Sequence, residues 1–200
     1  MNSKFFDLKK EKQDRMINAA LKVFATQGYR HGSTDDIVRE AGVSKGLLFH
    51  YFGSKVGVYR FIYDYSVKYM MLELRSTVDT KEKDLFIIVK QTERARLHAM
   101  RGYPYMQQFL NRSLSEDSYE ALLAVEEKKN ALEETCASID AQIAYDDLPG
   151  GIDGRKLRKM LDFTIKGLMT ERVQDASFQP DMLYEEICDY LETMRQIVYR

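Results

Sequence analysis

Residues 33–55, which read STDDIVREAGVSKGLLFHYFGSK, constrain the fold more than any other part of the chain. The hydroxyl of Ser33 can accept a hydrogen bond from the amide of Asp36, and the Asp36 carboxylate can reach back to the amide of Ser33, so this pair can cap a helix. Gly42 can end that helix, and Ser44 can cap a second one two residues later. Two short helices joined by so tight a turn predict a helix-turn-helix unit.

The second of these helices carries apolar side chains on more than one face. Leu48 and Phe52 lie four residues apart and are predicted to be core. Leu47, Phe49 and Tyr51 fall outside that face, and a helix surrounded only by water does not need them there. A partner surface is therefore expected. It suits either the major groove of DNA or, as the alternative, a helical protein interaction module that binds its partner through these apolar side chains.

Charge is unevenly distributed along the chain. The whole 200-residue sequence has a net charge of -1, with 30 Lys and Arg against 31 Asp and Glu. Residues 1–60 hold 11 Lys and Arg against 6 Asp and Glu, a net charge of +5, which leaves -6 for the remainder. A basic N-terminal part on an acidic body favours contact with nucleic-acid phosphates, with chance asymmetry as the alternative.

Hydrophobic periodicity predicts helices throughout and therefore an all-α fold. An N-terminal three-helix domain that carries the helix-turn-helix is placed at residues 1–53, and a larger helical domain at 54–200. Helices are expected over residues 9–27 and 54–77, and in the body over 83–100, 104–113, 118–145, 155–175 and 181–198. The helix over 54–77 has an apolar stripe from Val58 to Leu72 and is predicted to connect the two domains.

Several function classes lack their sequence signals. No apolar run reaches the length of a membrane span, and the N-terminus turns charged after Phe6, so we expect a cytoplasmic protein without a membrane partner. Cys136 and Cys188 lack a CxxC motif and a His at metal spacing, so no metal site is expected. No nucleophile with its base, phosphate loop or catalytic pair of acids is recognisable, so we expect neither an enzyme nor a cofactor.

An ordered series of features runs from Met16 to Phe61. A Gly-Tyr helix end at Gly28 is followed by Ser-Thr, Asp-Ile, Ala-Gly-Val-Ser, Gly, Leu-Phe, His-Tyr-Phe and finally Ser-Lys at Lys55. In this order and spacing, the series resembles the N-terminal domain of TetR family transcriptional regulators. The resemblance implies a DNA-binding regulator, in which residues 1–53 are the DNA-binding domain and residues 54–200 the helical domain for effector binding and dimerisation. The C-terminal portion matches the family only in being helical and of suitable length.

The resemblance also implies which side chains contact double-stranded DNA. These residues are Thr34, Lys45, Gly46, Leu47, His50, Tyr51 and Lys55. Lys45, Gly46 and Leu47 would face the bases, while hydroxyl and ammonium groups on either side would bind phosphates. His50 would either contact DNA or pack beside Phe49.

Three positions depart from the family pattern. Phe49 stands where a Tyr usually contacts the DNA backbone, and Gly53 stands where Pro is frequent. Gly57 replaces the usual acidic residue, which is expected to weaken the cap of the fourth helix.

For the body, the resemblance implies a homodimer formed by the last two long helices, both of which carry broad apolar stripes. The predicted interface residues are Leu168, Leu183, Ile187, Leu191 and Met194. Such a dimer places two recognition helices about 34–36 Å apart, so the operator is expected to be an inverted repeat.

The resemblance further implies an unidentified small-molecule effector that releases the protein from its operator, which makes the expected regulator a repressor. The residues that fall where the family builds its effector cavity are Met70, Met100, Tyr103, Met106, Phe109 and Phe163. Plain core packing is the alternative for each of them. An apolar or aromatic effector is expected, while Glu93 leaves a cationic one open.

Overall fold

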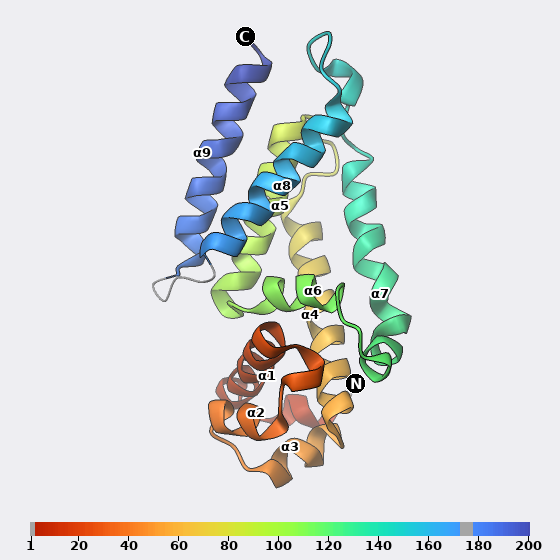
Figure 1. The fold of residues 1–200 in the computed structure, drawn as a ribbon, viewed down its shortest axis with the longest axis vertical. Helices are drawn as coiled ribbons and strands as arrows, with labels where there is room; N and C mark the ends of the chain where they lie inside the picture. The colour runs from red at the N-terminus through yellow and green to blue at the C-terminus, as the bar shows by residue number, and fades with distance from the viewer. Residues whose placement is uncertain (1–2, 173–177) are drawn as a thin grey trace. The chain divides into compact units, whose positions relative to one another are not determined.

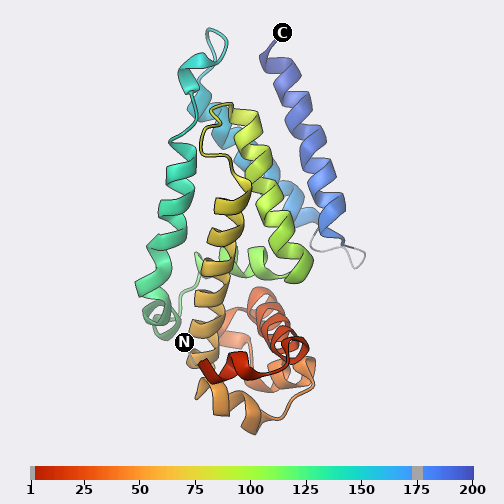
Figure 2. The same ribbon diagram turned by 180° about the vertical axis from the view of Figure 1, so that it is seen from behind.

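The structure is a computed structural model that describes residues 3–172 and 178–200. Within these ranges every regular element is a helix, as predicted (Figure 1, Figure 2). The elements are η1 (Ser3–Asp7), α1 (Lys10–His31), α2 (Thr34–Ala41), α3 (Lys45–Phe52), α4 (Lys55–Thr77), α5 (Leu85–Gly102), α6 (Met106–Ser113), α7 (Tyr119–Asp140), η2 (Tyr145–Asp147), α8 (Gly154–Arg172) and α9 (Pro180–Val198). Residues 173–175 of the helix predicted over 155–175 lie outside the described residues.

Local hydrogen bonds explain where α2 and α3 begin. The amide of Asp36 donates to Ser33 Oγ at 3.0 Å, and the Ser33 hydroxyl donates to the Asp36 carboxylate at 2.7 Å. Ser44 Oγ accepts from the amide of Leu47 at 3.2 Å. Gly42 ends α2 in the left-handed conformation, with φ 62° and ψ 42°, which a glycine adopts without a steric penalty. These caps confirm the predicted helix-turn-helix.

The first helix is interrupted at Gly28, where it was predicted to end. Gly28 has φ 74° and ψ 177°, outside the helical region, yet the chain returns to helix and continues to His31. The amide of Gly32 donates to the Gly28 carbonyl at 3.1 Å and closes this last turn. The prediction identified the glycine with positive φ but missed the turn that follows it.

The N-terminal segment η1 packs into the core of the helix-turn-helix. The Phe5 side chain is fully buried, with its ring centre 5.2 Å from that of Phe52 and 4.9 Å from that of Phe61. Gln13 holds the segment in place, since its Nε2 donates to the carbonyls of Phe6 and Leu8 at 3.0 and 2.7 Å. No packing role was predicted for these N-terminal residues.

By internal contacts the chain divides into two compact units. The first comprises Met1–Met71 with Ala99–Glu134, and the second comprises Leu72–His98 with Thr135–Arg200. This division follows packing, whereas the domain boundary after residue 53 separates proposed functions and stays a prediction. One detail of the α4 stripe was wrong: Leu72 is 65% exposed, and the buried positions near the end of the helix are Met70 and Leu74.

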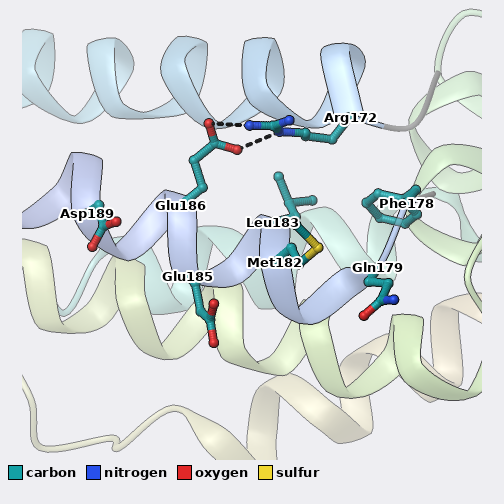
Figure 3. A pocket seen from close by; sticks show the side chains of 8 residues that line it. All are labelled: Arg172, Phe178, Gln179, Met182, Leu183, Glu185, Glu186 and Asp189. Atoms are coloured by element: carbon teal, nitrogen blue, oxygen red, sulfur yellow. Dashed lines mark hydrogen bonds and ion pairs between the residues drawn. The ribbon is translucent and has the colours of Figure 1, made fainter. Parts of the chain in front are cut away.

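In the second unit, α8 and α9 contact one another. The side chains buried on these two helices are Leu157, Leu161, Ile165 and Leu168 of α8, with Leu183, Ile187 and Leu191 of α9. An ion pair of two hydrogen bonds joins the helices, because Arg172 Nε and Nη2 donate to the two carboxylate oxygens of Glu186 at 2.7 and 2.9 Å (Figure 3). None of the described helices is both long enough and apolar enough to cross a membrane.

Candidate nucleic-acid interface

Helix α3 has one buried side and one open side. Leu48 is fully buried, as predicted, and fixes the helix to the core of the first unit. On the other side Lys45, Gly46 and His50 are exposed, and Leu47 is half-buried. A Cβ atom added at Gly46 would meet nothing within 4 Å, so the N-terminal turn of α3 is open to an approaching partner. This is the geometry that major-groove recognition requires of a helix.

Lys45 forms an ion pair with an acid on the neighbouring helix. Its Nζ lies 2.8 Å from Asp35 Oδ1, and both side chains are exposed. The pair holds the ammonium group at the N-terminal end of α3, the place where a base edge would be read. DNA would compete with Asp35 for this group, because both present oxygen acceptors to it. No role for Asp35 was predicted from the sequence. Its position directly after the first residue of α2, close to the Ser33 cap, was the one feature of the sequence that could have drawn attention to it.

The other acids of α2 are also neutralised. Asp36 pairs with Arg39 on the same helix, and Glu40 lies 2.6 Å from the Nζ atom of Lys22 on α1. The hydrogen bond from the Ser33 hydroxyl holds the pKa of Asp36 below its usual value. Negative charge on α2 is therefore balanced by cations within the first unit, which limits its repulsion of phosphates.

Thr34, Tyr51 and Lys55, the residues predicted to bind phosphates, differ in how strongly neighbouring residues restrict their side chains. Thr34 is half-buried at the first position of α2, and Tyr51 is half-buried between the rings of Phe5 and His50. Lys55 is the most restrained, with its Nζ 4.6 Å from the centre of the Tyr29 ring. Partial burial lowers the pKa of the Lys55 ammonium group.

The three departures from the family pattern have structural consequences. Phe49 is half-buried, so it packs, and Gly53 has φ 73°, a conformation that proline cannot adopt. At Gly57 a Cβ atom would lie 1.8 Å from the carbonyl oxygen of Phe52. The amide of Gly57 donates to Ser54 Oγ at 3.1 Å, so Ser54 caps α4. Gly57 has no side chain to complete a capping box, and the expected weaker cap stays a prediction.

The predicted effector residues fall into two groups. Five of them lie in the first unit and are buried there: Met70, Met100, Tyr103, Met106 and Phe109. The Tyr103 hydroxyl is fully engaged, since it donates to Asp14 at 2.8 Å and lies 2.6 Å from the Tyr65 hydroxyl. Phe163 lies on α8 in the second unit, and its side chain is 62% exposed. The assignment of these six residues to one pocket stays a prediction.

The predicted dimer residues are for the most part inside the second unit. Leu168, Leu183, Ile187 and Leu191 are buried within a single chain, and Met194 is half-buried. These buried side chains contribute to the core of the second unit, and their role in a dimer interface stays a prediction. The large apolar side chains that remain exposed on these helices are Met160, Phe163, Met182, Tyr190 and Ile197.

The alternative prediction was a protein-binding surface on α3, and the apolar area exposed there is smaller than expected. Leu47, Phe49 and Tyr51 are all half-buried, so none offers its whole side chain to a protein partner. The exposed residues of α3 are instead polar or lack a side chain. Among the described residues, no group of three or more His, Cys, Asp and Glu side chains could hold a metal ion.

Comparison with known proteins agrees with this geometry. Residues 16–60 match the family model described as bacterial regulatory proteins, tetR family. The chain is 35% identical over 78 residues to the HTH-type transcriptional regulator HbdR of Aromatoleum sp., and 32% identical over 77 residues to the HTH-type transcriptional activator FasR of Mycolicibacterium smegmatis. These alignments span 39% and 36% of this chain, but only 29% and 35% of the two relatives.

Solved structures resemble nearly the whole chain. A TetR family transcriptional regulator from Chloroflexus aurantiacus aligns with a TM-score of 0.62 at 21% identity, covering 98% of this chain and 94% of that one. A Clostridium perfringens protein described as a putative fatty acid metabolism regulator aligns with a TM-score of 0.61 at 20% identity, covering 88% and 96%. At these identities the likeness shows the fold alone.

Proposed function

This chain belongs to the tetR family of bacterial regulatory proteins, and from that premise we propose that it is a homodimeric repressor which a small-molecule effector releases from an inverted-repeat DNA operator. Its place of action would be the cytoplasm, where the operator DNA is. DNA binding of some kind follows from the family. The dimer, the repressor role and the effector are the proposed parts.

The observation that carries the proposal is the open N-terminal turn of α3. Lys45 and Gly46 are exposed there while Leu48, on the opposite side, is fully buried. A Lys at this position can donate to guanine O6 or N7, and Leu47 can contact a thymine methyl group. Thr34, Tyr51 and Lys55 would fix the register through phosphates, and His50 would lie at the edge of the same surface.

The dimer would form on the outer face of α8 and α9. Supporting this, Met160, Phe163, Met182 and Ile197 are each more than half exposed, so a partner helix could bury them. The predicted residues Leu168, Leu183, Ile187, Leu191 and Met194 would support this face from within. The two recognition helices would then meet one face of the duplex about one turn apart.

Selection of binding sequences from a pool of random DNA duplexes tests the proposal and requires no known operator. The selected sequences are expected to contain an inverted repeat, and fluorescence anisotropy should show binding that weakens steeply with salt. Selected sequences without a repeat would contradict the dimeric arrangement. Binding that fails to discriminate between selected and scrambled DNA would contradict sequence-specific regulation.

Two substitutions at one ion pair sharpen the test. Lys45→Ala should cost about 1–3 kcal/mol of operator binding and relax the preference at one base pair. Asp35→Asn should raise affinity for all DNA, because it removes a negative charge and frees Lys45. Lys90→Ala, an exposed lysine of α5 in the second unit, is the matched control and should bind as the wild type does.

The sense of regulation needs a separate measurement, since FasR is described as an activator. A reporter gene placed behind the selected operator should be expressed less when the protein is present. Higher expression would retain DNA binding but make repression wrong.

A further inference from the structure

A cavity of about 410 Å³ in the second unit is lined mainly by charged side chains. The residues that line it are Cys136, Ala137, Asp140, Tyr145, Arg155, Arg158, Lys159 and Asp162. They come from the end of α7, from η2 and from the first half of α8. None of them belongs to the set predicted for effector binding.

Both carboxylates of this cavity already accept hydrogen bonds from neighbouring side chains. Arg158 Nε lies 3.2 Å from Asp140 Oδ1, and Arg158 Nη1 donates to Asp162. The Tyr145 hydroxyl also donates to Asp140, at 2.9 Å. Burial, with this hydrogen bond, raises the pKa of Tyr145 to about 12, so it remains a donor at neutral pH. A cationic ligand would have to displace Arg158 to reach either acid.

Two cations of the cavity have no such partner. Arg155 and Lys159 lie four residues apart on α8, and in the described part of the chain neither forms an ion pair with a carboxylate. The Arg155 guanidinium lies 5.7 Å from the centre of the Tyr145 ring, and Lys159 Nζ lies 5.6 Å from that of Phe163. Both side chains are exposed, so an anion could approach them at little desolvation cost.

The charge network extends inward from the cavity to α5. Arg96 interacts electrostatically with Asp162 and with Cys136, and it forms an ion pair with Glu93. Glu93 is only 6% exposed, and its burial raises the pKa of the carboxyl. Buried ion pairs contribute little net stability, so the stability of the fold alone does not account for this network.

The net charge of the side chains that line the cavity favours an anionic ligand. Its lining has three cations, Arg155, Arg158 and Lys159, against two anions, Asp140 and Asp162, which leaves a net charge of +1. Arg158 with its two acids keeps a net charge of -1, so the excess positive charge comes from Arg155 and Lys159, which together carry +2. An anion there would gain two charge-assisted contacts without breaking an existing pair.

We propose that this cavity binds a small organic anion, through a carboxylate or phosphate group held by Arg155 and Lys159 and a hydrophobic part against Tyr145. Only the role of this ligand as the effector rests on the proposed function; the binding site itself does not. The class differs from the apolar, aromatic or cationic effector that the sequence predicted. A volume of this size accommodates a molecule with one ring and one charged group.

Thermal unfolding of the full chain with four probes tests the site. Benzoate and phenyl phosphate should raise the unfolding temperature in a saturable way, and their relative effect shows whether a carboxylate or a phosphate is preferred. Neutral benzamide and cationic benzylamine should not. If either of these two stabilises the protein as much as the anions do, or if neither anion stabilises it, the proposal is overturned.

Variants locate the binding. The Arg155→Ala and Lys159→Ala double variant should lose about tenfold or more in anion affinity, because two charge-assisted contacts disappear. Lys166→Ala, another exposed lysine of α8 outside the cavity lining, should keep the wild-type affinity. All three substituted positions are exposed, so the fold should survive, as circular dichroism checks. Unchanged affinity in the double variant would overturn the site.

A DNA-binding measurement separates this inference from the proposed function. If the anion binds and weakens operator binding in the wild type but not in the double variant, the site is the effector site. If it binds with no change in operator affinity, the effector role is wrong while the site stands. Failure of specific DNA binding in the absence of any anion would count against the proposed function alone.

Discussion

The ammonium nitrogen of Lys55 lies 4.6 Å from the centre of the Tyr29 ring. The same atom donates to the Arg30 carbonyl oxygen at 3.3 Å, so the first turn of α4 is tied to the last turn of α1. Tyr29 is in turn fixed by α7 and the segment before it, since its hydroxyl donates to Glu120 and its amide donates to Glu116. A residue predicted to bind phosphate is thus oriented before DNA arrives.

Lys55→Ala is expected to weaken binding to every DNA sequence alike, because a phosphate contact carries no base information. The slope of log affinity against log salt should fall in magnitude by about 1.8 for the proposed dimer, because each of its two chains loses one phosphate contact worth about 0.9. Anisotropy titrations at several salt concentrations measure it. Lys68→Ala, at an exposed lysine further along α4, is the control; an equal loss in both variants would contradict a specific contact of Lys55.

Gly57→Ala should destabilise the protein, although alanine normally favours a helix. The added methyl group would lie 1.8 Å from the Phe52 carbonyl oxygen, so the junction of α3 and α4 has to shift. We expect a loss of about 1–3 kcal/mol in the free energy of unfolding, measured in urea. In Gly167→Ala on α8 the new methyl group meets nothing within 4 Å, and a gain of about 1 kcal/mol is expected there. Equal effects at both sites would refute the argument.

Stability should depend on pH through Asp36. Its pKa is lowered in the folded chain from the ordinary value of 3.8, chiefly by the hydrogen bond from Ser33. Such a carboxyl stabilises the fold at pH values above its unfolded pKa, and this contribution disappears as the pH falls through the lower, folded value. Asp36→Asn should therefore be less stable than the wild type near neutral pH, and the difference should vanish in acid.

Urea unfolding at pH values from neutral down to about 2 follows this difference. Asp7→Asn, at an exposed acid outside α2, corrects for the change in net charge. A wild type and an Asp36→Asn variant that differ by the same amount at every pH would show that the carboxylate charge plays no part in the cap.

The sequence predicted those parts of the fold that depend on neighbouring residues. Helix α3 begins at Lys45, directly after the Ser44 cap, as predicted. Helical spacing also predicted that Leu48 and Phe52 are core; Leu48 is fully buried, whereas Phe52 is half-buried. The base-contacting turn was located through the family resemblance and stays a prediction.

What the sequence missed depends on contacts between distant segments. Periodicity showed that α8 and α9 each carry an apolar stripe, but it could not show that residues such as Ile187 are buried within a single chain. It likewise gave no sign that Asp35 pairs with Lys45, or that Phe163 is exposed. Each of these outcomes is decided by which helix covers a given face, and no local pattern encodes that.

Phe5→Ala tests the least expected of these distant contacts. The ring is completely buried among Tyr51, Phe52 and Phe61, so its removal leaves a cavity behind α3 that the surrounding rings cannot fill without moving. We expect a loss of about 3–5 kcal/mol in the free energy of unfolding. Phe6→Ala is the matched control, because the neighbouring ring is 41% exposed and should cost far less.

The same variant also links the N-terminal segment to DNA binding. Tyr51 and Phe52 lie at the end of α3, and Phe5 contacts both of their rings. At a temperature where Phe5→Ala is still folded, its operator affinity should fall more than that of Phe6→Ala, since the orientation of Tyr51 is no longer fixed. Anisotropy with the selected operator measures both variants. Equal affinities would mean that Phe5 stabilises the first unit without positioning its recognition helix.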